Sequence, residues 1–423
     1  MSDGVAPNLI AAVDEAKHWD RLMQMAAIGA IPDAEGKMVG VNRACLTPLD
    51  RQARRLIIGW AQALGMSVSV DEIGNLFFRH EGTDANAAPV LTGSHMDTQP
   101  NGGRFDGIWG VVAGLEAVQA IRDAGVATKR PIEVVAWTNE EGGRFAPGCM
   151  GSMAWAGFKP ANTWDGVADP DGITFGDALK EHLAEEADIP RRPLGYQPYA
   201  YLEAHIEQGP RLEAEGYDIG VVTGIQGSRW FIVELTGETA HAGTAPLSMR
   251  KDAIQDMIRA INALNDLMAD PTDVLRFTVG RIEVHPNTSN SVADKVRFTI
   301  DFRHPDKEVL ILNGDAIENT IRTAVKNCDV KVTERFHALP VEFDPIVQNA
   351  VSKAASEQGL KQIDLPSGAF HDAQFVVPVC PTGMLFVPCF KGISHNPAEY
   401  SKPEELAKGV RVLAQALADL ANQ

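Results

Sequence analysis

Seven side chains that can bind metals or transfer protons stand near the ends of apolar segments in this sequence. They are His95, Asp97, Asp106, Glu140, Glu141, His205 and His395. Most of them lie at or just after the carboxyl end of a run that has the composition of a buried strand. Open α/β sheets bind ligands at this edge, so we expect side chains that are distant in sequence to converge there.

Imidazoles combined with carboxylates suit borderline metals such as zinc, manganese or cobalt. Two ions roughly 3.5–4 Å apart need a carboxylate that bridges them, and either Asp106 or Glu141 can do so. The residue types leave open whether the site holds one ion or two. Asp97 follows His95 on the same side of an extended segment, so we expect its carboxylate to accept a hydrogen bond from the imidazole. Adjacent Glu140 and Glu141 point different ways, so one can ligate while the other acts as a general base.

The elements that must position these residues alternate between strands and helices. Buried strands are expected at residues 88–95, 130–141, 200–209 and 382–388. Helices are expected at residues 10–30, 49–65, 110–125, 346–358 and 402–421, with a hairpin within 66–82. This alternation predicts an α/β domain with a mainly parallel sheet.

The middle of the chain has a different pattern. Strand-like segments at 224–238, 275–286, 294–306 and 329–336 are separated by helical patterns at 248–270 and within 304–327. The order strand–helix–strand–strand–helix–strand is typical of a ferredoxin-like α+β sandwich. We therefore expect a discontinuous first domain, residues 1–212 and 336–423, and an inserted second domain, residues 213–335.

Composition narrows the classes of protein and partner. A chain of 423 residues exceeds the usual size of one hydrophobic core. The net charge of −18 argues against nucleic acid or an anionic membrane surface as a partner, and no apolar run is long enough to span a membrane. The N-terminal sequence has no secretory pattern, and the five cysteines are scattered without a CxxC motif. We therefore expect reduced thiols and a cytoplasmic location.

Taken together, the motifs resemble those of the amidase/hydantoinase/carbamoylase group of two-metal hydrolases. The resemblance rests on GSHMDTQPNGGRFDGIWG, TNEEGGRFAPGCMGS, LEAHIEQGPRLEAEG, GIQGSRWFIVELTGETAHAGTAPLSMRKDA, SNSVADKVRFTIDFRHPD, SGAFHDAQ and GISHNPAEYS. These segments follow the family's order over nearly the whole chain. The group includes N-carbamoyl-L-amino acid hydrolases, β-ureidopropionases and allantoate amidohydrolases, and is related to aminoacylases and carboxypeptidase-type metallopeptidases.

The resemblance implies a role for each residue of the site. The terminal ligands of two divalent metals, zinc or else manganese, cobalt or nickel, would be His95, Glu141, His205 and His395. Asp106 would bridge the two ions. Glu140 would be the general base, and Asp97 would be the partner of His95.

The resemblance also implies a substrate pocket. Gln208, in IEQGP, matches the position that separates these amidases from the peptidases. Gly368 and Phe370, in SGAFHDAQ, belong to a motif close to the site, and the family usually has glycine where this chain has Phe370. We expect the benzyl group of Phe370 to fill pocket volume and narrow the specificity.

Three residues of the inserted domain resemble lid residues of the family. His241, in TAHAGT, matches a histidine that stabilises the tetrahedral intermediate. Asn290 and Arg303 match residues that hold the substrate carboxylate, a task that suits a guanidinium fork. In the family this domain is a lid that also forms a homodimer, so its residues would serve the site of either the same or the partner subunit.

These observations predict a metal-dependent amidohydrolase. Its expected reaction is cleavage of the ureido C–N bond of an N-carbamoyl-L-amino acid or N-carbamoyl-β-alanine to amino acid, CO₂ and ammonia. Allantoate or another linear amide is the alternative substrate, followed by the dipeptides or N-acyl amino acids of the related peptidases, against which Gln208 argues. A non-catalytic binding protein on the same fold is the last alternative, and the presence of all seven site candidates argues against it.

Overall fold

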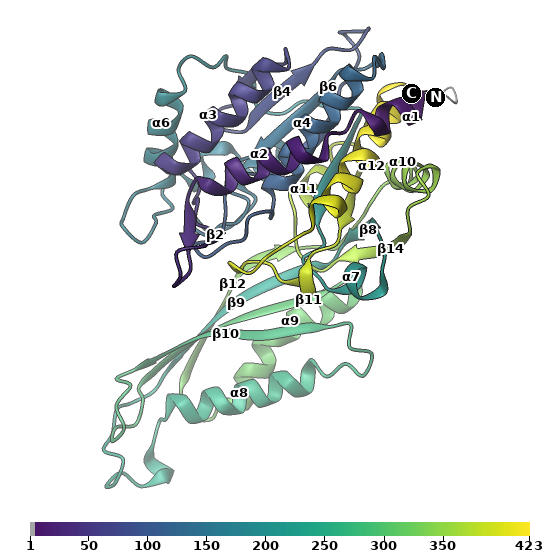
Figure 1. The fold of residues 1–423 in the computed structure, drawn as a ribbon. Helices are drawn as coiled ribbons and strands as arrows, with labels where there is room; N and C mark the ends of the chain where they lie inside the picture. The colour runs from purple at the N-terminus through teal and green to yellow at the C-terminus, as the bar shows by residue number, and fades with distance from the viewer. Residues whose placement is uncertain (1–4) are drawn as a thin grey trace. The chain divides into compact units, whose positions relative to one another are not determined.

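The computed structural model describes residues 5–423, and the chain divides into two compact units (Figure 1). Unit 1 extends to Gly224 and resumes at Glu342, and unit 2 is Ile225–Val341. Both boundaries fall later than the expected 213 and 335. The first boundary is later because β8 (Ile219–Ile225) pairs with β15 (Thr382–Val387) in the sheet of unit 1. The second is later because the last strand of unit 2 continues past residue 335 to Ala338.

The described part of unit 1 is built on one mixed sheet. Across the sheet its strands are β13 (Val341–Glu342), β8, β15, β7 (Ala200–Ile206), β5 (Val90–His95), β6 (Ile132–Trp137), β4 (Leu76–His80) and β3 (Ser67–Val70), with β14 (Gln362–Ser367) paired to β8. The central strands β15, β7, β5 and β6 run parallel, whereas β8, β4 and β3 pair antiparallel to their neighbours. Every residue of these four central strands is buried, which explains their continuous apolar composition.

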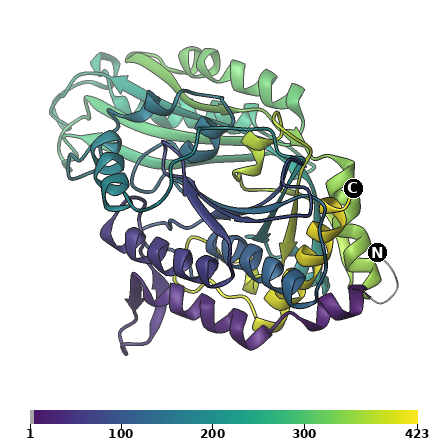
Figure 2. The same ribbon diagram turned by 90° about the horizontal axis from the view of Figure 1, so that it is seen from above.

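Helices cover both faces of these central strands. One face carries α4 (Ile108–Asp123), α12 (Pro403–Ala421) and α10 (Pro345–Glu357), and α1 (Val5–Ala11) and α2 (Glu15–Ala27) pack against α4 and α12. In both views α1 and α12 lie side by side (Figure 2). The short helix α11 (Ala373–Val376) lies against β7 and β15, and α5 (Met150–Trp155) contacts α11.

The remaining elements of unit 1 lie around this core. They are β1 (Ala30–Pro32), β2 (Met38–Val41), α3 (Pro48–Ala63), η1 (Ala161–Trp164), α6 (Phe175–Glu185), α7 (Arg211–Glu215) and η3 (Phe390–Gly392). The expectation of one helix over residues 10–30 is wrong. The first helix ends at Ala11, and a second begins at Glu15. The side chain of Asp14 caps α2 by accepting a hydrogen bond from the Lys17 N–H at 3.0 Å.

Unit 2 is a four-stranded antiparallel sheet with two helices. Its elements are β9 (Gly227–Thr236), η2 (Leu247–Met249), α8 (Ala253–Leu267), β10 (Arg276–His285), β11 (Lys295–His304), α9 (Lys307–Ala324) and β12 (Asp329–Ala338). The strand order β10-β11-β9-β12 is that of the ferredoxin-like fold, as predicted. Alternate residues of β9 and β11, such as Val233 and Phe298, are fully buried with α8 and α9.

Two findings bear on the expected environment of the protein. Within residues 5–423, no helix combines the length and the apolar content that crossing a bilayer requires. All five cysteines, which lie in this range, are free thiols, and four of them are buried.

Candidate metal centre

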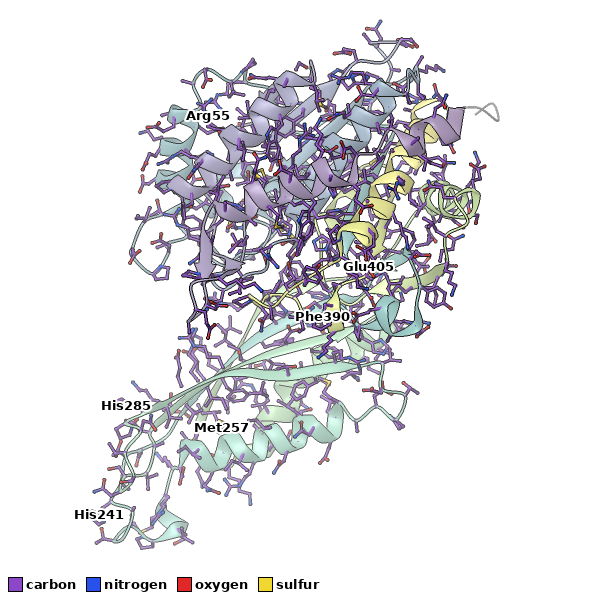
Figure 3. All side chains as sticks on the ribbon, viewed as in Figure 1. Arg55, His241, Met257, His285, Phe390 and Glu405 are labelled. Carbon is purple, nitrogen blue, oxygen red and sulfur yellow. The ribbon has the colours of Figure 1, made fainter. Side chains whose placement is uncertain are left out.

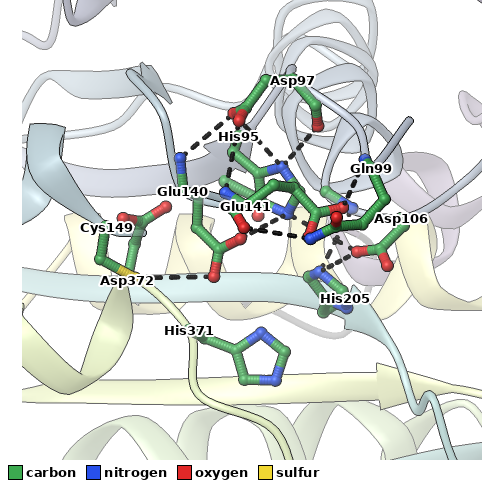
Figure 4. Close-up of polar contacts among 12 residues, drawn as sticks. His95, Asp97, Gln99, Asp106, Glu140, Glu141, Cys149, His205, His371 and Asp372 are labelled. Atoms are coloured by element: carbon green, nitrogen blue, oxygen red, sulfur yellow. Dashed lines mark hydrogen bonds and ion pairs between the residues drawn. The ribbon is translucent and has the colours of Figure 1, made fainter. Parts of the chain in front are cut away.

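The predicted ligands converge at the carboxyl edge of the large sheet (Figure 4). His95 is the last residue of β5, and His205 is the last but one of β7. The pair Glu140 and Glu141 follows β6 after a short turn, and His395 follows β15 and η3. Because β5, β6, β7 and β15 are parallel neighbours, their carboxyl ends lie together, and residues from distant parts of the chain meet.

Within the described residues, these side chains form two groups that can each hold a metal ion. One group is His95, Asp106 and His205, and all three residues are buried. The other is Asp106, Glu141 and His395. In each group the candidate ligand atoms lie within 4.8 Å of one another. Asp106 belongs to both groups, so it is the residue that can bridge two ions.

The two oxygens of Asp106 face different groups. Oδ1 lies 3.2 Å from His205 Nε2 and 3.6 Å from His95 Nε2. Oδ2 lies 3.5 Å from His395 Nε2, which is also 3.2 Å from Glu141 Oε2. A carboxylate in this orientation offers one oxygen to each of two ions, as binuclear hydrolase sites require.

Backbone carbonyls fix the tautomers of the two buried histidines. His95 Nδ1 lies 3.0 Å from the Asp97 carbonyl oxygen, and His205 Nδ1 lies 2.9 Å from that of Ile206. A carbonyl only accepts, so each Nδ1 carries a proton, and in the neutral ring Nε2 is the nitrogen that keeps a lone pair. The Gly107 N–H, 3.2 Å from His205 Nε2, agrees with this assignment. Each neutral ring therefore presents Nε2 to a metal ion, and the donor set fits the implied ions.

The carboxylate of Asp97 is not the main partner of His95, contrary to the expectation. Its Oδ1 lies 3.8 Å from His95 Nδ1, and the backbone carbonyl of Asp97 takes the hydrogen bond instead. The carboxylate accepts the N–H of Glu140 at 3.2 Å and that of Glu141 at 3.3 Å. Asp97 thus joins the loop after β5 to the loop after β6, which the spacing of His95 and Asp97 did not reveal.

Glu140 lies beside the first ligand group without belonging to either group. Its Oε2 is 3.4 Å from His95 Nε2, and its Oε1 accepts a hydrogen bond from Cys149 Sγ at 3.6 Å. Burial raises the pKa of Glu140 well above its usual range, although the charge of His95 acts in the opposite direction. A carboxyl group with a raised pKa is suited to take up and return a proton near neutral pH.

The electrostatics of the site favour a cation. Burial opposes the ionisation of Asp106, but interactions with His205 and His95 outweigh it and hold the pKa of Asp106 well below its usual range. The pKa of His395 is raised to about 9, first by its hydrogen bond with Glu141. Carboxylates that stabilise a protonated imidazole also stabilise a metal ion bound where that proton would lie.

Several polar residues of the site were not predicted from the sequence. Gln99 donates from Nε2 to Glu141 Oε2 at 2.9 Å, and the Ser394 hydroxyl lies 2.7 Å from Asp106 Oδ2. Glu399 is fully buried behind Asp106, and the His371 ring lies edge to face on that of His205, with centroids 4.5 Å apart. All four lie inside or next to the quoted motifs, but their partners come from other segments, so sequence spacing gave no sign of these contacts.

Gln208 is the predicted substrate residue that the structure brings to the ligands. Its Nε2 donates to Asp106 Oδ2 at 2.8 Å and to Ser394 Oγ at 3.2 Å. Its Oε1 is buried and has no hydrogen-bond partner within residues 5–423. Gly368 is exposed and Phe370 is half-buried, and both lie in the segment from β14 to α11 that contains His371.

Two ligand-bearing loops and the turn before Glu140 have left-handed backbone at residues other than glycine. The φ angles are 56° at Asn139, 55° at Gln208 and 52° at His395. Such conformations cost about 1–3 kcal/mol each and persist where the surrounding structure enforces them. The Asn139 side chain enforces its turn by donating to the carbonyl oxygens of Phe145 and Pro147.

The predicted lid residues lie at two ends of the sheet in unit 2. His241 is exposed (Figure 3). Its backbone bridges to Ser291, next to Asn290. Both are near the Lys295 end of β11, because Lys295 pairs with Thr236. Arg303 lies near the other end of β11, where its guanidinium binds Asp301 through two hydrogen bonds of 2.9 and 2.8 Å.

The chain joins a mixed α/β sheet to a ferredoxin-like unit and carries a candidate histidine–carboxylate metal site at the carboxyl edge of that sheet. These features are typical of a class of hydrolases that bind divalent metals. The chain belongs to the peptidase family M20/M25/M40, whose model matches residues 91–419. The fold and the hydrolase activity predicted from the sequence are thereby confirmed, and the non-catalytic alternative is set aside.

Similar proteins confirm the resemblance to the amidase/hydantoinase/carbamoylase group. The chain is 41% identical to an N-carbamoyl-L-amino-acid amidohydrolase from Rhizobium meliloti, over 98% of this chain and 99% of the relative. It is 35% identical to an allantoate amidohydrolase from Escherichia coli (strain K12), over 97% and 98%. A crystal structure of an amidase of the hydantoinase/carbamoylase family from Burkholderia vietnamiensis matches with a TM-score of 0.87 and 44% identity, over 97% and 98% of the two chains.

Proposed function

We propose that the protein hydrolyses the ureido C–N bond of an N-carbamoyl amino acid. One water is consumed, and the products are the free amino acid, CO₂ and ammonia. The observation that carries the proposal is the pair of ligand groups that share Asp106, with the unligated carboxyl of Glu140 beside them. The amidohydrolase relative with 41% identity supports the substrate class.

The residues of the site divide the work between binding and proton transfer. Two divalent ions held by the two groups would polarise the ureido carbonyl and lower the pKa of a water molecule. Glu140 takes the proton of the attacking water on its carboxylate and returns it to the departing nitrogen. The unpartnered Oε1 of Gln208 accepts an N–H of the ureido group, which satisfies a buried acceptor. Asp97 holds the backbone of Glu140 and Glu141 in place during these steps.

The proposed cofactors are two divalent ions per chain, zinc or else manganese, cobalt or nickel. Imidazole and carboxylate ligands accept all four, and availability decides among them. The free cysteines are consistent with a protein that functions in a reducing compartment, which we propose to be the cytoplasm.

We further propose a homodimer in which unit 2 acts as a lid and as the dimerisation domain. Arg303 lies eight residues along β11 from Lys295, a span of about 27 Å at roughly 3.4 Å per residue. His241 and Asn290 lie near the Lys295 end. One small substrate molecule cannot contact Arg303 and His241 of the same chain across this distance. Arg303 and His241 can therefore both contact the same substrate only if they come from two different subunits.

The test is metal-dependent release of ammonia by the full chain. Metal-stripped protein receives Zn, Mn, Co or Ni singly, and ammonia is measured with N-carbamoyl-β-alanine, N-carbamoyl-L-α-amino acids and allantoate. Dipeptides and N-acetyl amino acids are the comparison substrates, and their cleavage is followed by the free amino acid released, since it yields no ammonia. We expect metal-dependent turnover of the N-carbamoyl amino acids. Turnover of allantoate alone would identify the protein as an allantoate amidohydrolase and not an N-carbamoyl amino acid hydrolase. Cleavage of peptides alone would overturn the proposal.

The same panel tests Phe370 as a residue of the substrate pocket. We propose that its half-buried ring narrows the pocket, so Phe370→Gly should raise the kcat/KM of bulky N-carbamoyl amino acids relative to small ones by about 10–100-fold. Unchanged ratios across the panel would show that the ring does not touch substrate.

A further inference from the structure

We propose that Glu399 is a positioning residue for the shared ligand Asp106, which it holds so that each carboxylate oxygen faces one metal position. Glu399 contacts no substrate and is not a ligand in this proposal. The inference rests on the two-metal site proposed above and is independent of the identity of the substrate.

The loop that carries Asp106 needs an external partner. Asp106 lies between β5 and α4, and the first residue before α4, Gly107, provides no side-chain cap. The backbone N–H groups of Phe105 and Asp106 both donate to Glu399 Oε1, at 2.9 and 3.1 Å. Because one oxygen fixes two successive amides, it sets the direction in which the Asp106 side chain leaves the backbone.

The second oxygen of Glu399 connects to the other ligand group. Ser394 Oγ lies 3.1 Å from Glu399 Oε2 and 2.7 Å from Asp106 Oδ2, so one hydroxyl lies between the two carboxyl groups. Ser394 is next to His395, and the Glu399 N–H closes the same loop by donating to the Asn396 carbonyl at 2.9 Å. Glu399 thus joins the loop of Asp106 to the loop of His395.

The packing around Glu399 leaves no room for another arrangement. Its exposed fraction is 0%. A Cβ atom at Gly103 would lie 2.0 Å from Glu399 Cδ, so the chain before Asp106 runs directly over this carboxyl group. A residue with these contacts controls where Asp106 stands, and substitutions behind metal ligands typically cost 10–100-fold in metal affinity.

Metal binding to the chelator-stripped full chain tests the proposal without an activity assay. Zn²⁺ is titrated against a competing chromophoric chelator to obtain two dissociation constants, and His395→Ala identifies the one that belongs to its group. Because Asp106 belongs to both ligand groups, Glu399→Ala should weaken both binding steps by about 10–100-fold. Glu399→Gln should stay within about threefold of the wild type, because its amide oxygen still accepts both N–H groups and its amide nitrogen donates to Ser394.

A buried glutamate away from the site provides the matched control. Glu186 is 1% exposed and pairs with Arg54 through two hydrogen bonds of 2.7 Å. Glu186→Ala should lower the thermal midpoint of the metal-free protein while leaving both zinc constants unchanged. The comparison separates the effect of lower fold stability from the effect of a displaced metal ligand on zinc binding.

Each outcome decides one question. A wild type that binds fewer than two zinc ions would refute the proposed two-metal site itself. A normal wild type, with Glu399→Ala within about threefold of it at both steps, would overturn the role of Glu399 alone. If Glu399→Gln binds zinc as weakly as Glu399→Ala, the role of Glu399 is overturned as well, because its charge and not its hydrogen bonds would then determine zinc affinity. If Glu399→Ala does not fold, Ser394→Ala replaces it, and unchanged zinc constants in that variant would overturn the proposal.

Discussion

At the scale of single residues, Glu140 is oriented by its backbone as much as by its side chain. Its N–H donates to Asp97 Oδ1 at 3.2 Å, and its carbonyl accepts the N–H of Cys149 at 2.9 Å. The carboxyl group therefore stands next to His95 whether or not it carries a proton. This is the arrangement expected of a group that must exchange a proton repeatedly without moving away.

The first prediction concerns the proton carried by Glu140. Glu140→Gln keeps the size of the side chain but cannot accept a proton, so kcat should fall by at least about 10²–10⁴-fold. Both metal ions should remain bound, because Glu140 belongs to neither ligand group. The measurements are kcat on the best substrate and metal content by mass spectrometry. Retained turnover would remove Glu140 as the base, and loss of metal would make it a ligand.

A second prediction concerns His18, a buried histidine away from the ligand groups. Its Nε2 accepts the Trp109 Nε1–H at 3.1 Å, and burial together with the charge of Arg21 lowers its pKa from 6.5 to about 3. Between these two pH values His18 is protonated in the unfolded chain but not in the folded protein. The free energy of unfolding therefore falls as the pH falls, by up to about 1.4 kcal/mol per pH unit from this group.

The variant His18→Gln isolates this contribution. Its amide oxygen can still accept the Trp109 hydrogen bond, but it does not titrate. Relative to the variant, the wild type should lose about 3 kcal/mol of unfolding free energy between pH 6.5 and pH 4. Urea unfolding across this range measures the difference. A constant difference at all pH values would show that His18 protonates in the folded state.

At the scale of elements, α4 is seated directly on the strands that end in metal ligands. A Cβ atom at Gly110 would lie 2.2 Å from the carbonyl oxygen of Ala204 and 2.9 Å from Ser94 Cβ. These two residues precede His205 and His95 in β7 and β5. The close approach of helix and sheet therefore fixes the positions of two ligands.

Gly110→Ala should disturb both the fold and the site. We expect a loss of about 1–3 kcal/mol in the free energy of unfolding and weaker zinc binding. The control is Gly59→Ala on the exposed side of α3, where an added Cβ meets nothing within 4 Å. It should stabilise the protein by about 0.5–1 kcal/mol. Equal effects of the two substitutions in urea unfolding would contradict the packing argument.

At the scale of the whole molecule, the proposed division of the site between two subunits gives a complementation test. Glu140→Gln and His241→Ala chains, each inactive alone, are mixed and refolded together. If His241 serves the partner's site, each mixed dimer has one intact site. Half of the dimers are mixed, so about a quarter of the wild-type activity should return.

The outcome of the mixing experiment is clear in either direction. No recovery, although size measurements show mixed dimers, would mean that His241 acts in its own subunit. A protein that stays monomeric at assay concentrations while fully active would refute the shared site. Dimers of Glu140→Gln alone are the control for residual activity.

The sequence by itself determined the elements and the types of ligand. Short continuous apolar runs bounded by turn residues indicate buried strands, so β5, β6, β7 and β15 and the polar residues at their ends were predictable from the sequence. The strands of unit 2 were predictable from a different pattern, the alternation of apolar and polar residues, and its helices from helical spacing. Element ends were less certain: the helix expected over 10–30 is divided at Asp14, and the strand expected over 130–141 ends at Trp137.

Only the tertiary structure decided which atoms meet. The residue types left both Asp106 and Glu141 able to bridge, and the family resemblance implied Asp106. The structure shows that Asp106 is the carboxylate shared by both groups. The carboxylate of Asp97 binds the Glu140 loop and not His95, and Glu399 reaches Asp106 from a segment near the C-terminus. Hydrophobic periodicity depends on near neighbours in the chain, whereas hydrogen bonds form between groups that folding brings together. No spacing in the sequence records these contacts.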